Sequence, residues 1–300
     1  MHEPGRPLPW WWYVVALAAH SGWGLYPVLG RYLQTVSGLP SMSVLVLGGT
    51  PLFLWLLVGI LPRHGWRLYS ARVLWLFGGV TVLRSITNLL AQRYTLALYV
   101  QMIGLLTPFW VVLIHAVLFR ERLPRSTLPA MLLSTAGALL MFSGSSAPVP
   151  GHDDWLGIGL ALASSFFLAG YMLLLRRTAQ VQISGLSVLA FQTVLVQACA
   201  LGLSLLWQEP WGRWLQLDWQ GWTAFAAYSG LVVLGANSLQ IAAVRRLGAP
   251  LVSSLMGWRL VVTLVAGWWL LGEQLTTVWQ VVGMLLVLAA VSGYLRRQIP

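Results

Sequence analysis

Long apolar stretches separated by short polar segments dominate the amino-acid sequence. A helix needs about 20 mostly apolar residues to cross the hydrocarbon core of a bilayer. Ten stretches approach or reach this length: residues 10–30, 42–61, 73–92, 96–119, 126–142, 155–175, 184–207, 221–244, 249–271 and 277–295. No cleavage motif follows the first stretch, so it is interpreted as a helix rather than a signal peptide. The pattern predicts an all-α integral membrane protein with ten transmembrane helices.

Composition agrees with this prediction. Hydrophobic residues make up 58% of the 300 residues and charged residues 8%, whereas soluble domains carry about 25% charged residues. The net charge is +11, and every lysine-or-arginine position is an arginine. The arginines stand singly or in short groups between apolar stretches. This distribution favours a role in membrane orientation over a nucleic-acid-binding patch. Cys199 is the only cysteine, so no intrachain disulfide is possible, and neither a metal nor a cofactor is expected.

The arginines predict which face of the membrane each loop occupies. An even number of helices places both termini on one side, together with the loops after the second, fourth, sixth and eighth helices. That side collects 13 arginines: Arg6, Arg63, Arg67, Arg72, Arg120, Arg122, Arg125, Arg176, Arg177, Arg245, Arg246, Arg296 and Arg297. The other side has 3: Arg31, Arg93 and Arg213. Because cytoplasmic loops are enriched in arginine, both termini are predicted to be cytoplasmic.

The two halves of the chain look like copies of each other. Residues 1–143 form one predicted five-helix repeat and residues 155–300 a second, with a polar linker at 144–154. Ala97 and Glu121 of the fourth helix and its exit match Ala249 and Glu273 of the ninth at an offset of 152. Five helices per repeat turn the second copy upside down in the membrane. Inverted repeats of this kind are typical of secondary transporters, whose binding site lies between the repeats near the midplane.

These motifs resemble a known family. Each repeat has an apolar helix that ends in a short Glu-containing turn, Phe-Arg-Glu-Arg-Leu at 119–123 and Leu-Gly-Glu-Gln-Leu at 271–275. Leu-Thr-Pro-Phe at 106–109 and Ser-Gly-Trp-Gly at 21–24 complete the similarity to EamA-type proteins of the drug/metabolite transporter superfamily. The second repeat departs from the family by carrying Arg259-Leu260 where a proline is usual. The resemblance implies a carrier of small metabolites in the bacterial inner membrane.

Two arginines lie inside predicted helices. Arg84 is near the middle of the third helix and Arg259 near the middle of the ninth, where a guanidinium costs about 2.5–3.5 kcal/mol on insertion scales. Thr81 and Asn88 share a polar face with Arg84, and all seven acidic residues fall in or near loops. We therefore expect both arginines to line the transport pathway and bind an anionic group of the substrate. The alternative is that they bond backbone carbonyls and hold helices together.

Further candidates are polar or aromatic residues on neighbouring helices. Amide side chains expected to line the cavity or to bond between helices are Gln101, Asn237 and Gln240. Aromatic candidates, which could equally be packing or interface residues, are Trp23, Tyr26, Tyr171 and Trp258. His20 and His115 are candidates for carrying a coupling proton, the alternative being neutral hydrogen-bonded imidazoles. Glu121 and Glu273 are expected to be helix caps or hinges rather than substrate ligands.

The sequence favours a secondary transporter, more an exporter than an importer, acting by alternating access on a small metabolite with an anionic or zwitterionic group, such as an amino acid or organic acid. The expected partners are this substrate and the lipid bilayer, with no nucleic acid, and the protein is expected to act as a monomer or homodimer. Two other classes stay open, an intramembrane enzyme with a lipid-linked substrate and a membrane scaffold. For the enzyme, Asp153-Asp154 in the linker is the only adjacent carboxylate pair available to hold Mg²⁺.

Overall fold

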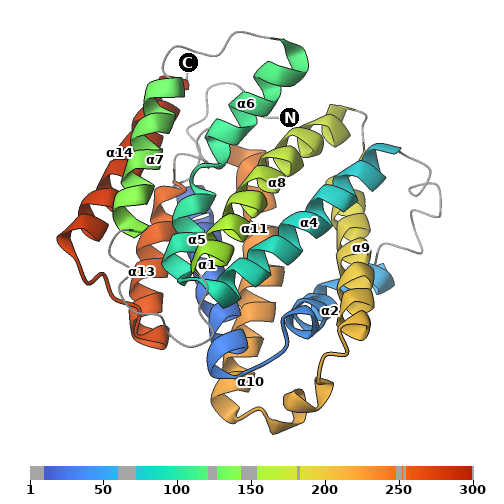
Figure 1. Ribbon diagram of the computed structural model, residues 1–300. Coiled ribbons are helices and arrows are strands. Elements are labelled where there is room, and N and C mark those ends of the chain that lie inside the picture. Colours follow the sequence, from blue (N-terminus) through green and yellow to red (C-terminus); the bar gives the residue numbers. More distant parts are fainter. Residues whose placement is uncertain are drawn as a thin grey trace.

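A computed structural model describes residues 10–59, 72–120, 127–142, 154–180, 183–247, 252 and 255–298. Every regular element in these ranges is a helix, and the helices form one bundle (Figure 1). Residues 144–153 of the predicted linker and Glu121 lie outside the described residues, whereas the last linker residue, Asp154, begins α8. The elements are α1 (Trp11–Arg31), η1 (Tyr32–Val36), α2 (Ser41–Gly59), α4 (Arg72–Tyr94), α5 (Ala97–Gly104), α6 (Thr107–Phe119), α7 (Thr127–Phe142), α8 (Asp154–Gln180), α9 (Gly185–Leu206), η3 (Trp211–Gln216), α10 (Trp219–Ala226), η4 (Ala227–Ala236), α11 (Asn237–Leu247), α13 (Gly257–Leu271) and α14 (Val278–Gln298).

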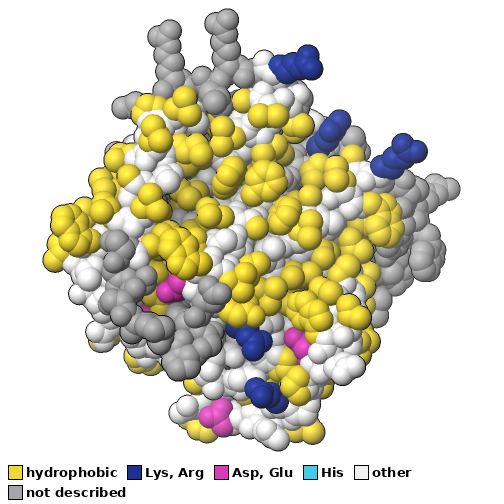
Figure 2. All heavy atoms as spheres, in the orientation of Figure 1, with side chains coloured by type: hydrophobic (Ala, Val, Ile, Leu, Met, Phe, Trp, Pro, Cys, Tyr) yellow, Lys and Arg dark blue, Asp and Glu magenta, His cyan; other side chains and the backbone are white. Residues whose placement is uncertain are grey.

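Four described helices have the length and apolar composition to cross a membrane: Arg72–Tyr94, Ala97–Leu118, Asp154–Leu175 and Gly185–Leu206. Shorter apolar helices cover Ser41–Leu56, Thr127–Phe142, Gly257–Leu271 and Val278–Tyr294. Hydrophobic side chains spread over the middle of the face seen in Figure 2, with charged side chains toward its upper and lower parts. A surface of this kind suits the hydrocarbon core of a bilayer, where exposed apolar side chains carry no hydration cost.

The fourth predicted helix is interrupted, because α5 ends at Gly104 and α6 begins at Thr107. Pro108 is the cause: it has no backbone N–H to donate to the carbonyl four residues earlier, which belongs to Gly104. The hydroxyl of Thr107 donates to that carbonyl instead, at 2.7 Å. The result is a two-residue break between two helices.

The eighth predicted helix is also irregular. It begins as the α-helix α10, continues as a ten-residue π-helical segment, η4, and returns to α-helix in α11. π-Helical turns are uncommon and occur often at functional sites. The segment contributes Tyr228, Val232 and Val233 to the cavity described below.

Contacts between helices follow a regular pattern. The third predicted helix (α4) packs on the sixth (α8), and the first (α1) packs on the eighth (η4 and α11). The fourth (α5 and α6) packs on the sixth, and the ninth (α13) on the first. The second (α2) pairs with the seventh (α9), and the fifth (α7) with the tenth (α14). Exchanging the two halves of the chain leaves these contacts unchanged.

Candidate functional site

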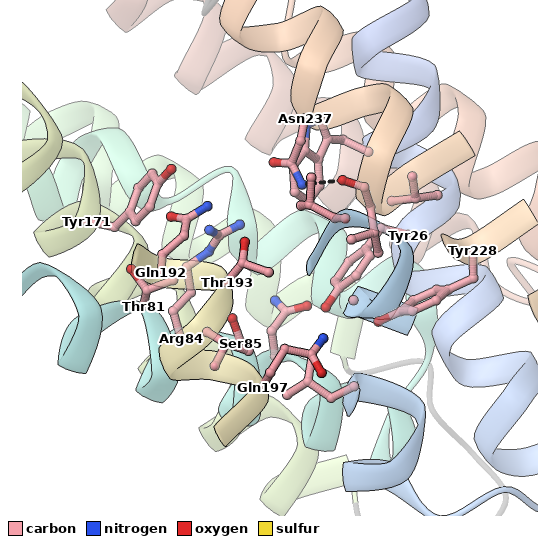
Figure 3. Close-up of a pocket in the computed structure, with 18 residues that line it drawn as sticks. Tyr26, Thr81, Arg84, Ser85, Tyr171, Gln192, Thr193, Gln197, Tyr228 and Asn237 are labelled. Carbon is pink, nitrogen blue, oxygen red and sulfur yellow. Dashed lines mark hydrogen bonds between the residues drawn. The ribbon is translucent and has the colours of Figure 1, made fainter. Parts of the chain in front are cut away.

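A cavity of about 110 Å³ lies among α1, α2, α4, α8, α9, η4 and the start of α11 (Figure 3). Its volume suits a small metabolite rather than a macromolecule. The polar and aromatic residues that line it are Trp23, Tyr26, Thr81, Arg84, Ser85, Asn88, Tyr171, Gln192, Thr193, Gln197, Tyr228 and Asn237. Apolar residues, among them Leu45, Leu52 and Val196, complete the wall. The cavity thus combines one cation, several amides and hydroxyls, and aromatic faces.

A second cavity of about 50 Å³ shares a wall with the first. Trp23, Tyr26, Arg84 and Asn88 line both of them. The second cavity extends toward α5 and α13, and its further lining residues are Pro27, Val100, Gln101, Gly104, Leu168, Met256 and Arg259. The two cavities together bring residues of both predicted repeats around Arg84.

Arg84 projects from α4 into the first cavity (Figure 3). Its guanidinium carbon lies 5.1 Å from the ring centroid of Tyr171 and 5.7 Å from that of Trp23. In the part of the chain that the structure describes, no carboxylate or hydrogen-bond acceptor contacts this guanidinium. Aromatic faces attract a cation by about 0.5–2 kcal/mol each, but they do not satisfy its N–H donors. Arg84 therefore presents unused donors to the cavity.

Arg259 is in a different environment, although the sequence predicted the same role for both arginines. Its side chain is buried, with 9% exposed, and its Nε donates to His20 Nδ1 at 2.8 Å. Its Nη2 donates to Gln240 Oε1 at 3.3 Å, and its guanidinium carbon lies 5.7 Å from the Trp23 ring centroid. Arg259 thus lines the smaller cavity with part of its hydrogen-bonding capacity already used.

His20 is held at both ring nitrogens. Nε2 donates to the carbonyl oxygen of Val252 at 2.8 Å, and Nδ1 accepts the hydrogen bond from Arg259. Adding a proton at Nδ1 would set it against the Arg259 N–H, so this geometry favours the neutral imidazole. His115 lies half-buried on α6 and is not among the residues that line either cavity.

Most of the predicted polar and aromatic residues reach the cavities, whereas Gln240 and Trp258 line neither of them. Thr81, Asn88, Trp23, Tyr26, Tyr171 and Asn237 line the larger cavity, and Gln101 lines the smaller one. Gln240 acts on the site through Arg259. Trp258 is 43% exposed and donates from Nε1 to Ser21 Oγ at 2.9 Å. Trp258 therefore belongs to the surface of the bundle, which was the alternative interpretation of the aromatic residues.

Sequence reasoning missed the contribution of α9. Gln192, Thr193 and Gln197 line the larger cavity, and the side-chain oxygen of Gln192 is buried without a hydrogen-bond donor among the described residues. The indole N–H of Trp23 is likewise buried without an acceptor. The spacing of these three polar residues in an apolar stretch, with two adjacent and the third four positions later, could have indicated a polar helix face toward a cavity. No group of three or more His, Cys, Asp or Glu suited to a metal occurs among the described residues.

The apolar helices of the bundle are those of a multi-pass membrane protein, and Arg84 faces a cavity inside it. The model of the EamA-like transporter family matches residues 155–296. This match over the second half of the chain confirms the resemblance to EamA-type proteins of the drug/metabolite transporter superfamily. Proteins of this family are multi-pass membrane transporters.

Comparison with solved structures supports the fold of the whole chain. Twenty-four chains of solved structures match. One of them, described only as a crystal structure of a protein, has a TM-score of 0.61 at 18% sequence identity, over 95% of this chain and 98% of the other. At that identity the likeness concerns the fold alone. No curated protein sequence matches the chain.

Proposed function

We propose that this protein is a secondary transporter that exports a small metabolite with an anionic or zwitterionic group across the bacterial inner membrane. The observation that carries the proposal is Arg84, a guanidinium that faces a central cavity with aromatic neighbours and no acceptor among the described residues. A bidentate carboxylate or phosphate oxygen pair would satisfy two of its donors. The other lining groups, such as Gln192, would receive hydrogen-bond donors of the substrate.

The contact pattern supports the mechanism of alternating access. Contacts that survive exchange of the two halves are expected of two inverted five-helix repeats, here 1–143 and 155–300. The cavities lie between helices of both halves, where rocking of one repeat against the other would expose them to each face in turn. The protein in this proposal has ten transmembrane helices, cytoplasmic termini and an outer linker, and works as a monomer or homodimer.

The first experiment identifies the ligand. Purified protein is screened by thermal shift against amino acids, organic acids, amines and sugar phosphates. We expect stabilisation by compounds with a carboxylate or phosphate, because they pair with Arg84, and none by purely cationic amines. Stabilisation by amines alone would contradict the proposal.

The intramembrane enzyme is less well supported by the site. Among the described residues, no carboxylate lines either cavity, and carboxylates are the side chains that hold Mg²⁺ in transferases of lipid-linked substrates. Turnover of a candidate lipid-linked substrate in detergent, without net flux, would favour the enzyme over the transporter.

A further inference from the structure

A buried ion pair joins the two halves of the chain at the end of the bundle away from the termini (Figure 1). Arg31 is the last residue of α1, and Glu273 follows α13. Arg31 Nε lies 2.9 Å from Glu273 Oε1, and the two side chains are 10% and 8% exposed. The proposed orientation places this pair at the outer face of the membrane.

Backbone groups extend the pair into a network. Glu273 Oε1 also accepts from the backbone N–H of Ala97, the first residue of α5, at 3.1 Å. A carboxylate is favoured there because the N-terminus of a helix carries partial positive charge. Arg31 Nη1 donates to the carbonyls of Gln92, at 3.1 Å, and Thr95. Arg31 thereby ties the end of α1 to the end of α4.

Asp154 links the halves a second time. It is the first residue of α8, and its Oδ1 accepts from the hydroxyl of Thr95 at 2.7 Å. A side chain added at Gly157 would collide with Thr95, so α8 and the α4–α5 turn are in close contact. Arg31, Thr95, Asp154 and Glu273 form what we call the outer cluster. Arg31 and Thr95 come from the first repeat, Glu273 comes from the second, and Asp154 is the last linker residue and begins α8, so the two halves cannot separate at this end while the cluster is intact.

The outer cluster is also connected to the substrate cavities. Gln92, whose carbonyl binds Arg31, donates from its side chain to Asn88 Oδ1 at 2.7 Å. Asn88 lines both cavities and lies one helical turn from Arg84. Pro27 and Val100, which line the smaller cavity, lie one turn from Arg31 and from Ala97, respectively. The cluster therefore lies immediately beyond the cavities in the direction of the outer face.

The energetics of the Arg31–Glu273 pair suit a contact that breaks when the protein changes conformation. Burying two charges costs several kcal/mol per ion, and the cost is recovered only where every polar atom is satisfied. Among the described residues, no hydrogen-bond donor contacts the buried Glu273 Oε2 within normal geometry, although the backbone N–H groups of Ala97 and Leu98 both act on this carboxylate. A buried carboxylate oxygen that lacks a donor contributes little to the stability of the closed state. Water would donate to this oxygen if the outer end of the bundle opened. Both partners would reach water if the outer ends of α1, α5, α8 and α13 moved apart.

We propose that Arg31 and Glu273 form the outer gate of the transport path, closed in this conformation and separated when the protein opens outward. The proposal rests on the transport function and orientation proposed above. It assigns to both residues a role in conformational change that is independent of substrate contact. Removing either partner should weaken the charge pairing of the closed state and shift the protein toward the outward-open state, more strongly in Arg31→Gln than in Glu273→Gln, because Arg31 also interacts with Asp154.

The test measures access to the smaller cavity from outside. Gly104→Cys, in a Cys199→Ser background, places a thiol in that cavity, and a Cβ at Gly104 has no heavy atom within 4 Å. A small membrane-impermeant thiol reagent is added to intact cells, and the rate of modification is recorded. Glu273→Gln and Arg31→Gln are each expected to raise this rate at least about tenfold, since a tenfold shift requires only about 1.4 kcal/mol.

Asp218→Asn is the matched control. Asp218 is another outer carboxylate, but among the described residues its side chain accepts only from the backbone N–H of Gly221 in its own helix, at 2.8 Å. This variant should keep the parental rate. Unchanged or slower modification in both gate variants would overturn the gate and leave the pair a structural contact. Faster modification only in inside-out vesicles would overturn its assignment to the outer face. Neither outcome depends on substrate binding at Arg84, which is measured separately in detergent, so failure of the gate and failure of the proposed function can be distinguished.

Discussion

Replacing Arg84 by glutamine should separate a ligand-binding arginine from one that holds helices together. A hydrogen bond to a charged group contributes about 1.5–3 kcal/mol, so loss of the guanidinium should weaken an anionic ligand about tenfold to a hundredfold. Arg84→Lys should rescue only part of this, because lysine lacks the planar pair of donors that a carboxylate accepts from arginine. Both effects require that Arg84 contacts the ligand directly.

The stability of the unliganded protein should not fall in the Arg84→Gln variant, in contrast to its affinity for the ligand. A central guanidinium costs about 2.5–3.5 kcal/mol in the membrane, and its two aromatic neighbours return about 0.5–2 kcal/mol each. The guanidinium has no hydrogen bond to lose among the described residues. Arg84→Gln should therefore leave the unliganded protein as stable as the parent or slightly more stable. If Arg84 instead held helices together, its replacement by glutamine would lower the unfolding temperature of the unliganded protein.

The assay combines ligand affinity by titration calorimetry with thermal unfolding in detergent, both on the ligand found in the screen. Arg213→Gln is the control, since Arg213 binds the carbonyl of Gly38 at the exposed outer surface and should not affect affinity. Unchanged affinity in a folded Arg84→Gln variant would refute the reasoning. So would a large loss of stability without ligand.

The remaining predictions concern the surroundings of the site. Arg259→Gln should lower the unfolding temperature of the unliganded protein, because His20 and Gln240 each lose a hydrogen-bond partner; an unchanged temperature would show that these bonds contribute nothing. His20→Gln should keep flux driven by a pH gradient, since both ring nitrogens are engaged; selective loss of that flux, with exchange retained, would make His20 the coupling site. An impermeant thiol reagent outside the cell should label Ala147→Cys but not His2→Cys, and the reverse pattern would overturn the orientation. Gly283→Ala should destabilise the α7–α14 contact by about 1–3 kcal/mol, because the new methyl group meets the Gly137 carbonyl, whereas Gly159→Ala, which meets nothing within 4 Å, should not; equal unfolding midpoints for the two would contradict the packing.

The helices could be predicted from the sequence because apolar length alone decides which segments can cross a bilayer. Each of the ten predicted stretches contains described helix, and among the described residues four of these helices are long and apolar enough to cross a membrane. Local deviations were harder. The proline at position 108 indicates that the helix is disturbed. The hydrogen bond from the Thr107 hydroxyl to the Gly104 carbonyl, which replaces the missing backbone bond, depends on the side-chain rotamer of Thr107. Nothing in the composition of 227–236 signals a π-helical segment.

The candidate site was predictable to the extent that it depends on polar residues in apolar stretches. Arg84, Thr81 and Asn88 share a face of one helix, and they line one cavity. What the sequence could not supply was the partner of each charge. Arg259 meets His20 from the other end of the chain, so its use as a hydrogen-bond donor was hidden. The same holds for Arg31 and Glu273, since Glu273 was expected to cap a helix but its pairing with α1 and α5 arises only from packing.

Flux through proteoliposomes tests the central claim most directly. Purified protein is reconstituted with the anionic or zwitterionic ligand from the screen, without nucleotide, and counterflow of the labelled compound is measured for the parent and for Arg84→Gln. The account predicts counterflow by the parent and its loss, by at least about tenfold, in the variant. Counterflow that persists at the parental rate in Arg84→Gln, or a parent that binds the ligand but never moves it, would contradict the account.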